Sequence, residues 1–187
     1  MTGTLDDVSL IERVRQGNAH AYGLLVQRYQ RYAYTLALRV VRDPMVAEEV
    51  AQDAFVQAYR ALDSFEGTAK FSTWLYRIVL NAALATQRKK KRPQTPEMPT
   101  HLADTVQASD DLLGQERRAY LEQGLAELSE KDRTLLTLYY FQELSLEEMA
   151  EVVAQPVNTV KVQVHRARAR LARVLEKLMK EEVHSLL

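Results

Sequence analysis

Residues 144–171 read LSLEEMAEVVAQPVNTVKVQVHRARARL. Ser145 and Glu148 form the Ser-x-x-Glu pattern of a capping box, which predicts the start of a short helix. Pro156 ends that segment by resetting the chain direction, and a second and longer helical pattern follows it. Two helices joined by a short break are typical of a helix-turn-helix.

The helix after Pro156 has an apolar stripe and a basic outer face. The stripe, which we expect to be buried, comprises Val157, Val160, Val164, Ala167, Leu171 and Val174. Residues 156–173 contain five Lys or Arg residues and no acid. A solvated helix usually carries both charges, so this face favours an anionic partner such as DNA. A packed helix with a basic, solvated face is the alternative.

The N-terminal half of this helix carries mixed polar side chains, and that half makes the base contacts in a helix-turn-helix. We expect base-edge contacts from Asn158, Val162, His165 and Arg166, and phosphate contacts from Lys161, Arg168 and Arg173. Val162 is apolar yet points outward, which suits a thymine methyl group or a partner surface. His165 taken alone is more typical of a surface histidine.

The composition is that of a folded, non-secreted protein. The 187 residues are 47% hydrophobic and 27% charged, with no cysteine and four scattered histidines. These counts predict a folded chain without disulfides, metal ligands or cofactors. The N-terminus lacks the features of a signal peptide, and no apolar run is long enough to span a bilayer. We therefore expect a cytoplasmic protein.

Three prolines divide the chain. Pro93, Pro96 and Pro99 open a segment with four acids and no base, which predicts a linker. Helix starts at Asp43-Pro44, Ser72 and Ser129, and the absence of a period-two pattern, predict an all-α fold. We expect two small helical domains, 1–92 and 115–187, joined by a flexible linker at 93–114. The sequence does not indicate how the two domains are arranged.

Aromatic and basic residues alternate around residue 70. The segment and the helix that follows it contain Phe65, Lys70, Phe71, Trp74, Arg77, Asn81 and Arg88, and a basic run occupies 88–92. Rings that stack on bases, beside cations that hold phosphates, suit single-stranded nucleic acid. Burial of Phe71 and Trp74 in a core, with the basic run as a solvated helix end, is the alternative.

The predicted helix at 45–62 has an alanine-rich face that permits close packing. Its opposite face presents Glu49, Gln52, Asp53, Val56 and Arg60. A charged face is commonly only solvated, but acidic groups within a basic domain favour a protein partner.

Three segments together resemble the extracytoplasmic-function (ECF) sigma factors of bacterial RNA polymerase, in the sigma-70 family. They are AEEVAQDAFVQAYRAL (47–62), FSTWLYRI (71–78) and PVNTVK (156–161). In order and spacing, the resemblance covers nearly the whole chain. It implies a non-catalytic specificity subunit that keeps only sigma regions two and four and directs transcription initiation.

The resemblance also implies a role for each surface. The helix at 47–62 would dock on the clamp helices of the polymerase β′ subunit, and the loop at 63–71 would capture a flipped base of the −10 element. Asn81 lies where the family contacts promoter DNA. The helix at 157–170 would read the −35 element, its domain would touch the β flap, and the linker would run through the RNA exit channel.

Further partners follow from the same resemblance. It implies an anti-sigma factor, free or membrane-anchored, that masks both DNA-binding faces in a stress or envelope response. Outside such complexes we expect a monomer. The recognition helix departs from the family, which commonly has Gly, Ser and Arg where Asn158, Val162 and Gln163 stand. The base sequence that this helix reads is therefore not predicted.

Two other classes of protein compete with this interpretation. A helix-turn-helix regulator with an N-terminal sensor domain would leave the aromatic-basic loop and the linker unexplained. A nucleic-acid-processing enzyme could use Glu48 and Glu49, but adjacent carboxylates point to different sides of a helix and share a proton poorly.

Overall fold

The computed structural model describes residues 6–90 and 112–185. Every regular element in these two ranges is helical, which confirms the predicted all-α class. The elements are α1 (Asp7–Arg15), α2 (Ala19–Val41), α3 (Pro44–Ala61), the 3-10 turn η1 (Leu62–Ser64), α4 (Phe71–Lys90), α5 (Leu112–Glu127), α6 (Glu130–Leu136), the π-helical turn η2 (Thr137–Phe141), α7 (Leu146–Val153) and α8 (Val157–Ser185). None of these described helices is both long and apolar enough to cross a bilayer.

Most of the predicted helix starts are confirmed. The Asp43 carboxylate accepts a hydrogen bond from the Val46 amide, and the Ser129 hydroxyl accepts one from the Asp132 amide. Ser72 was expected to cap α4, but that helix begins at Phe71, so Ser72 lies inside its first turn. Residues 93–111 of the predicted linker lie outside the described residues. The last three residues of that linker, 112–114, belong to α5.

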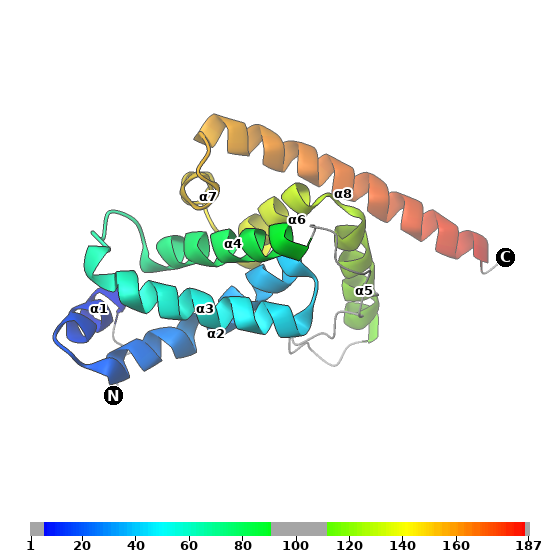
Figure 1. Ribbon diagram of the computed structural model, residues 1–187. Coiled ribbons are helices and arrows are strands. Elements are labelled where there is room, and N and C mark those ends of the chain that lie inside the picture. Colours follow the sequence, from blue (N-terminus) through cyan, green and yellow to red (C-terminus); the bar gives the residue numbers. More distant parts are fainter. Residues whose placement is uncertain (1–5, 91–111, 186–187) are drawn as a thin grey trace.

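The first four helices form one bundle (Figure 1). α2, α3 and α4 pack against one another, and α1 lies across the end of α2. α3 can approach its neighbours closely because its inner face is built from small residues. The fully buried members of that face are Ala47, Ala54 and Ala58.

The last four helices form a second unit with a small core of its own. Leu125, Leu136 and Ala167 lie in this core, between α5, α6 and α8. Gly124 allows α5 and α8 to meet, because a Cβ atom there would lie 2.8 Å from Leu175 Cδ2. α8 then runs on past α5 at the edge of the molecule (Figure 1).

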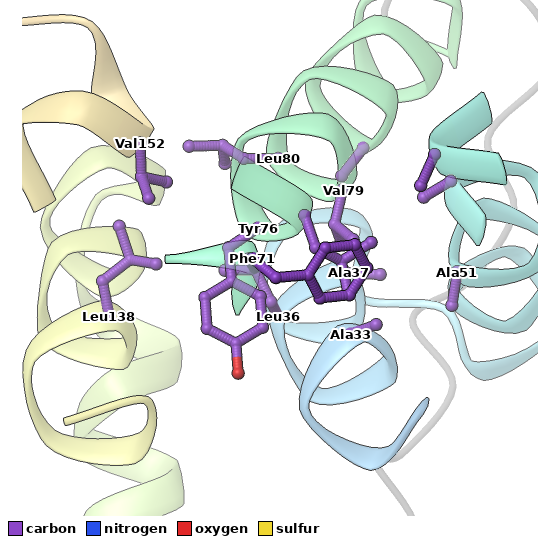
Figure 2. Packing of buried hydrophobic residues seen from close by; sticks show 14 of the residues in the cluster. Ala33, Leu36, Ala37, Ala51, Phe71, Tyr76, Val79, Leu80, Leu138 and Val152 are labelled. Atoms are coloured by element: carbon purple, nitrogen blue, oxygen red, sulfur yellow. The ribbon is translucent and has the colours of Figure 1, made fainter. Parts of the chain in front are cut away.

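The two units share a continuous hydrophobic core. α7 packs on α4, and α6 packs on α2. Figure 2 shows Val152 of α7 and Leu138 of η2 facing Leu80 and Tyr76 of α4, with Leu36 of α2 beside them. All five side chains are buried and belong to one cluster. The described residues therefore form a single closed body, although the sequence divides them into two domains.

Arg133 provides the polar centre of this contact. Its side chain is only 5% exposed, and Nε donates a hydrogen bond to the Arg39 carbonyl oxygen on α2 at 2.8 Å. Nη1 donates to the Leu125 carbonyl oxygen at the end of α5 at 3.3 Å. Burial, and then the nearby charge of Arg42, lower the pKa of Arg133, but a guanidinium remains protonated at neutral pH. One cation thus joins three helices by their backbones.

Side chains add two further links between the units. Both terminal nitrogens of Arg39 on α2 donate to the Glu122 carboxylate on α5, and the same guanidinium lies 5.1 Å from the centre of the Phe141 ring. The side-chain amide nitrogen of Gln142, Nε2, donates a hydrogen bond to the Tyr32 carbonyl oxygen at 3.3 Å. These contacts fix the register of the second unit on α2.

We predict that Arg133→Ala lowers the free energy of unfolding by about 2–4 kcal/mol, because it leaves buried carbonyl groups without a donor. Urea denaturation followed by circular dichroism measures this change. Arg133→Lys keeps the charge but loses the forked geometry, so we expect a smaller loss. An unchanged midpoint in the alanine variant would show that Arg133 does not hold the two units together.

Candidate nucleic-acid interface

The predicted helix-turn-helix is formed by α7 and α8. The capping box at the start of α7 is complete, because the Glu148 amide donates to Ser145 Oγ at 3.2 Å and the Ser145 amide donates to Glu148 Oε2 at 2.8 Å. Ala154 ends α7 with a left-handed backbone at φ 52°. The Pro156 carbonyl oxygen then accepts from the Val160 amide, which starts α8.

The buried stripe of α8 is as predicted, with one exception. Val160, Val164, Ala167 and Leu171 are buried, and Val174 is half-buried. Val157 was expected in this stripe, but it is 36% exposed. It occupies the first turn of α8, before the helix reaches the core.

The outward face of α8 matches its predicted composition. Asn158, Val162, His165 and Arg166 are exposed, as are Lys161, Arg168 and Arg173. Val162 is 48% exposed, although it is apolar. The face is therefore available for a partner and carries an apolar contact among its polar groups.

Some polar groups near this face already have partners within the protein. The Arg168 guanidinium lies 5.9 Å from the centre of the Tyr140 ring. Arg170 donates two hydrogen bonds of 2.7 Å to the Asp132 carboxylate on α6, which makes it a structural cation. Burial alone would raise the pKa of Asp132, but the hydrogen bonds from Arg170 and then from Ser129 hold it below its ordinary value.

The aromatic residues around position 70 form a cluster, and most of it is core. Phe65 and Phe71 are 9% and 3% exposed, and the Phe65 ring lies 5.1 Å from the ring of Trp74. In this conformation neither phenylalanine can stack on a base, so the alternative of burial holds for Phe71, and Phe65, which was predicted to contact DNA, is buried as well. Trp74 is half-buried and keeps part of its ring accessible.

The polar residues predicted beside these rings are exposed. Arg77, Asn81 and Arg88 lie on one side of α4, where Arg88 Nε also donates to the Leu84 carbonyl oxygen of its own helix at 3.2 Å. Lys70 precedes α4 and is exposed as well. The basic run at 88–92 lies only partly within the described residues, because residues 91 and 92 are outside them.

The aromatic-basic surface of α4 faces α7 and the turn of the helix-turn-helix across a cleft. A cavity of about 790 Å³ is lined on one side by Phe65, Trp74 and Arg77 and on the other by α7 with the first residues of α8. A second cavity, of about 560 Å³, continues past Asn81 towards Gln163. The surface on α4 and the turn before α8 are therefore neighbours in the closed body, whereas the predicted contact residues on the outward face of α8 line neither cavity.

One exposed ion pair crosses this cleft. Lys70 Nζ lies 2.8 Å from Glu148 Oε1, so a cation of the aromatic-basic loop is paired with the capping residue of α7. The hydrogen bond from Lys70 contributes most to holding the pKa of Glu148 below its ordinary value. A cation predicted to contact DNA thus has an internal partner in the closed conformation.

The predicted partner surface of α3 is exposed along its length. Glu49, Gln52, Asp53, Val56 and Arg60 all point away from the core. The structure adds Met45 and Tyr59, which are 77% and 48% exposed and which the sequence reasoning missed. Helical spacing could have placed Met45 on this face, since it precedes Glu49 by four residues. Apolar groups among charges are common at protein interfaces.

The fold and these surfaces define a helical DNA-binding protein with a helix-turn-helix and a second, aromatic-basic surface. Two family models match the chain: Sigma-70 region 2 over residues 25–93, and Sigma-70 region 4 over residues 118–171. The chain belongs to the ECF sigma factors of the sigma-70 family. It is thus a non-catalytic RNA polymerase subunit that directs transcription initiation, which excludes the regulator and the processing enzyme as alternatives.

Individual relatives support the assignment over almost the whole chain. The chain is 37% identical over 186 residues to the RNA polymerase sigma-H factor of Pseudomonas aeruginosa, covering 94% of this chain and 96% of that protein. It is 36% identical over 179 residues to the ECF sigma factor SigW of Bacillus subtilis, covering 90% and 96%. The structure of CnrH in complex with the cytosolic domain of CnrY matches with a TM-score of 0.69 at 26% identity, over 91% of this chain and 97% of that one.

The lowered pKa of Asp132 predicts how the stability of the region 4 unit depends on pH. A carboxylate with a lowered folded-state pKa stabilises the fold above its ordinary pKa, and this stabilisation is lost as the pH falls through the folded-state value. We expect Asp132→Asn to lower the melting temperature by about 4 °C at pH 7. The variant and the wild type should converge as the pH falls through the folded-state pKa of Asp132.

Differential scanning calorimetry from neutral pH down to about pH 2 tests this prediction. Glu127→Gln, which neutralises an exposed acid on α5, is the matched control and should leave the melting temperature nearly unchanged. A constant difference between Asp132→Asn and the wild type at all pH values would contradict the ion-pair explanation.

Proposed function

We propose that α8 reads the promoter −35 element, that α4 and the preceding loop hold the melted −10 element, and that α3 docks on the β′ clamp helices of core RNA polymerase. The observation that carries this proposal is the presence of two exposed polar surfaces, on α4 and α8, in a chain of the sigma-70 family. The third surface, on α3, is separate from both.

At the −35 element, Asn158, Val162, His165 and Arg166 would contact base edges, and Lys161 and Arg173 would contact phosphates. Their exposure on the outward face of α8 supports this division. Arg168 would also contact a phosphate. It would not have to leave the Tyr140 ring, since a stacked guanidinium still has free N–H donors.

At the −10 element, Trp74 would stack on a base while Lys70, Arg77, Asn81 and Arg88 hold the single strand. The accessible part of the Trp74 ring and the exposure of the four polar side chains support this role. Phe65 and Phe71 would form the floor of the site rather than contact bases, because both are buried. A flipped base stacked on Trp74 would keep the duplex open.

The partners of the chain follow the same reasoning. The α3 surface of Glu49, Gln52, Asp53, Val56 and Arg60 would dock on β′, and the region 4 unit would touch the β flap. An anti-sigma factor would cover the DNA-binding surfaces, a role supported by the structural match to CnrH, whose structure is a complex with the cytosolic domain of CnrY. From these partners we infer a cytoplasmic location. We also propose that the chain is a monomer when it is free.

Promoter binding would require the two units to separate. The −10 and −35 elements lie about 25 base pairs apart, which is about 85 Å along a DNA duplex. In the closed body, Arg77 on α4 and Gln155 beside α8 line the same cleft. One closed chain therefore cannot contact both elements at once, and we infer that the polymerase-bound form is open.

Transcription in vitro with purified core polymerase and genomic DNA tests the function, and mapping of the start sites identifies the promoters. We expect Asp53→Arg to weaken binding to core polymerase about tenfold, because it reverses a charge at the centre of the α3 surface. Glu12→Arg makes the same charge change at an exposed site on α1 and is the control. Equal binding by the two variants would remove α3 from the docking surface.

We predict that Arg166→Ala loses about 1–3 kcal/mol of discrimination at one base pair of the −35 element. Competition binding by the holoenzyme to promoters with single −35 substitutions measures this loss. Arg173→Ala serves as the comparison, since a phosphate contact should weaken all sequences alike. If Arg166→Ala also weakens all sequences alike, Arg166 contacts phosphate and not a base.

A further inference from the structure

The last residue of α1 contacts the loop that precedes α4. Arg15 Nη2 donates a hydrogen bond to the Leu62 carbonyl oxygen at 3.0 Å and a second one to the Phe65 carbonyl oxygen. These contacts join residues that are 47 and 50 positions apart in the sequence. A single guanidinium thus spans both ends of the turn that leads from α3 into the loop.

Arg15 adds hydrogen bonds to a turn that makes one of its own. η1 ends at Ser64, and the Phe65 amide donates back to the Leu62 carbonyl oxygen at 3.2 Å. Carbonyl groups at the end of a helical turn have no partner further along the helix, so a charged donor there is a strong substitute. Beyond Phe65, the loop is exposed at residues 66–68 and turns at Gly67 with φ +74°.

α1 is itself fixed, so it can hold the loop in place. Leu10 and Ile11 are 1% and 4% exposed and pack into the main core. The Asp7 carboxylate at the other end of α1 accepts hydrogen bonds from Arg28 and Tyr29 of α2. The backbone of Arg15 is therefore held by the bundle, and its exposed side chain reaches from there to the loop.

The backbone that Arg15 holds carries the floor of the proposed −10 site. The Phe65 ring lies 5.1 Å from Trp74 and 6.0 Å from Phe71. The loop residues, Trp74 and Arg77 line the same cavity. A movement of the Phe65 backbone would therefore shift the ring against which Trp74 rests, and small shifts matter in a site that must be preorganised.

We propose that Arg15 is a positioning residue for −10 recognition: it fixes the Leu62–Phe65 turn and so holds Phe65 under Trp74. The inference rests on the function proposed above and extends it to α1, which lies outside the region 2 match at 25–93. Both bonds come from Nη2, so lysine can replace arginine only as far as its shorter side chain brings the ammonium group to the same two carbonyl oxygens.

The test uses holoenzymes that contain wild-type chain, Arg15→Ala, Arg15→Lys or Arg15→Gln. Arg13→Ala removes an equal charge from the same turn of α1, at another exposed residue, and is the matched control. Open-complex formation is measured on a promoter mapped with the wild type and on versions with single −10 substitutions. The ratio between the promoters reports −10 selectivity, whereas a merely structural loss lowers all of them equally.

We expect Arg15→Ala to lower the selectivity ratio about tenfold, with Arg15→Lys and Arg15→Gln in between and Arg13→Ala unchanged. Trp74 is the only tryptophan, so its fluorescence in the free chain gives a second readout. It should become more accessible to acrylamide in Arg15→Ala. The fluorescence measurement needs no polymerase and remains informative if assembly is impaired.

Two results would overturn the inference. One is an Arg15→Ala holoenzyme with wild-type selectivity and unchanged Trp74 quenching. The other is an equal loss of selectivity in Arg13→Ala, which would show that charge near the DNA matters and the contact with the loop does not. A wild-type holoenzyme that starts at no promoter would instead refute the proposed function itself.

Discussion

The buried guanidinium of Arg133 is the contact on which the closed arrangement depends. It donates to the Arg39 carbonyl oxygen on α2 and to the Leu125 carbonyl oxygen on α5, where water has no access. Because a buried cation is costly unless its donors are satisfied, the two units must meet in one register. The same register aligns the apolar contact of α7 with α4, and described residues of both units share one hydrophobic cluster.

This closed arrangement has a direct consequence for function. The surface of α4 lines one cleft with α7 and the turn before α8, and Lys70 is paired with Glu148 beside that cleft. Opening would separate Arg133 from the Arg39 backbone and Arg39 from Glu122, and would expose apolar side chains of α4 and α7. We infer that polymerase and promoter contacts provide the free energy for opening, and that the free chain keeps α4 packed against the helix-turn-helix.

The sequence predicted the parts of this structure that depend on local patterns. Capping at Ser145, the stripe through Val160 and the exposed face of α3 all follow from helical spacing and were found. Contacts between distant segments have no such pattern. The burial of Phe65 depends on rings brought in by α4, and the roles of Arg15 and Arg133 depend on carbonyl groups far away in the chain. The shared core joins segments on either side of the predicted linker, so no local sequence pattern indicated it.

The distance between the two units tests the central claim most directly. The chain has no cysteine, so single cysteines can be placed at two exposed sites, Arg31 on α2 and Lys131 on α6, and labelled as a fluorescence donor–acceptor pair. Energy transfer is then measured in the free chain and in the complex of holoenzyme with promoter DNA. We predict high transfer in the free chain and a clear loss of transfer in the promoter complex. Equal transfer in both states, or low transfer in the free chain, would contradict the closed body and its opening on the promoter.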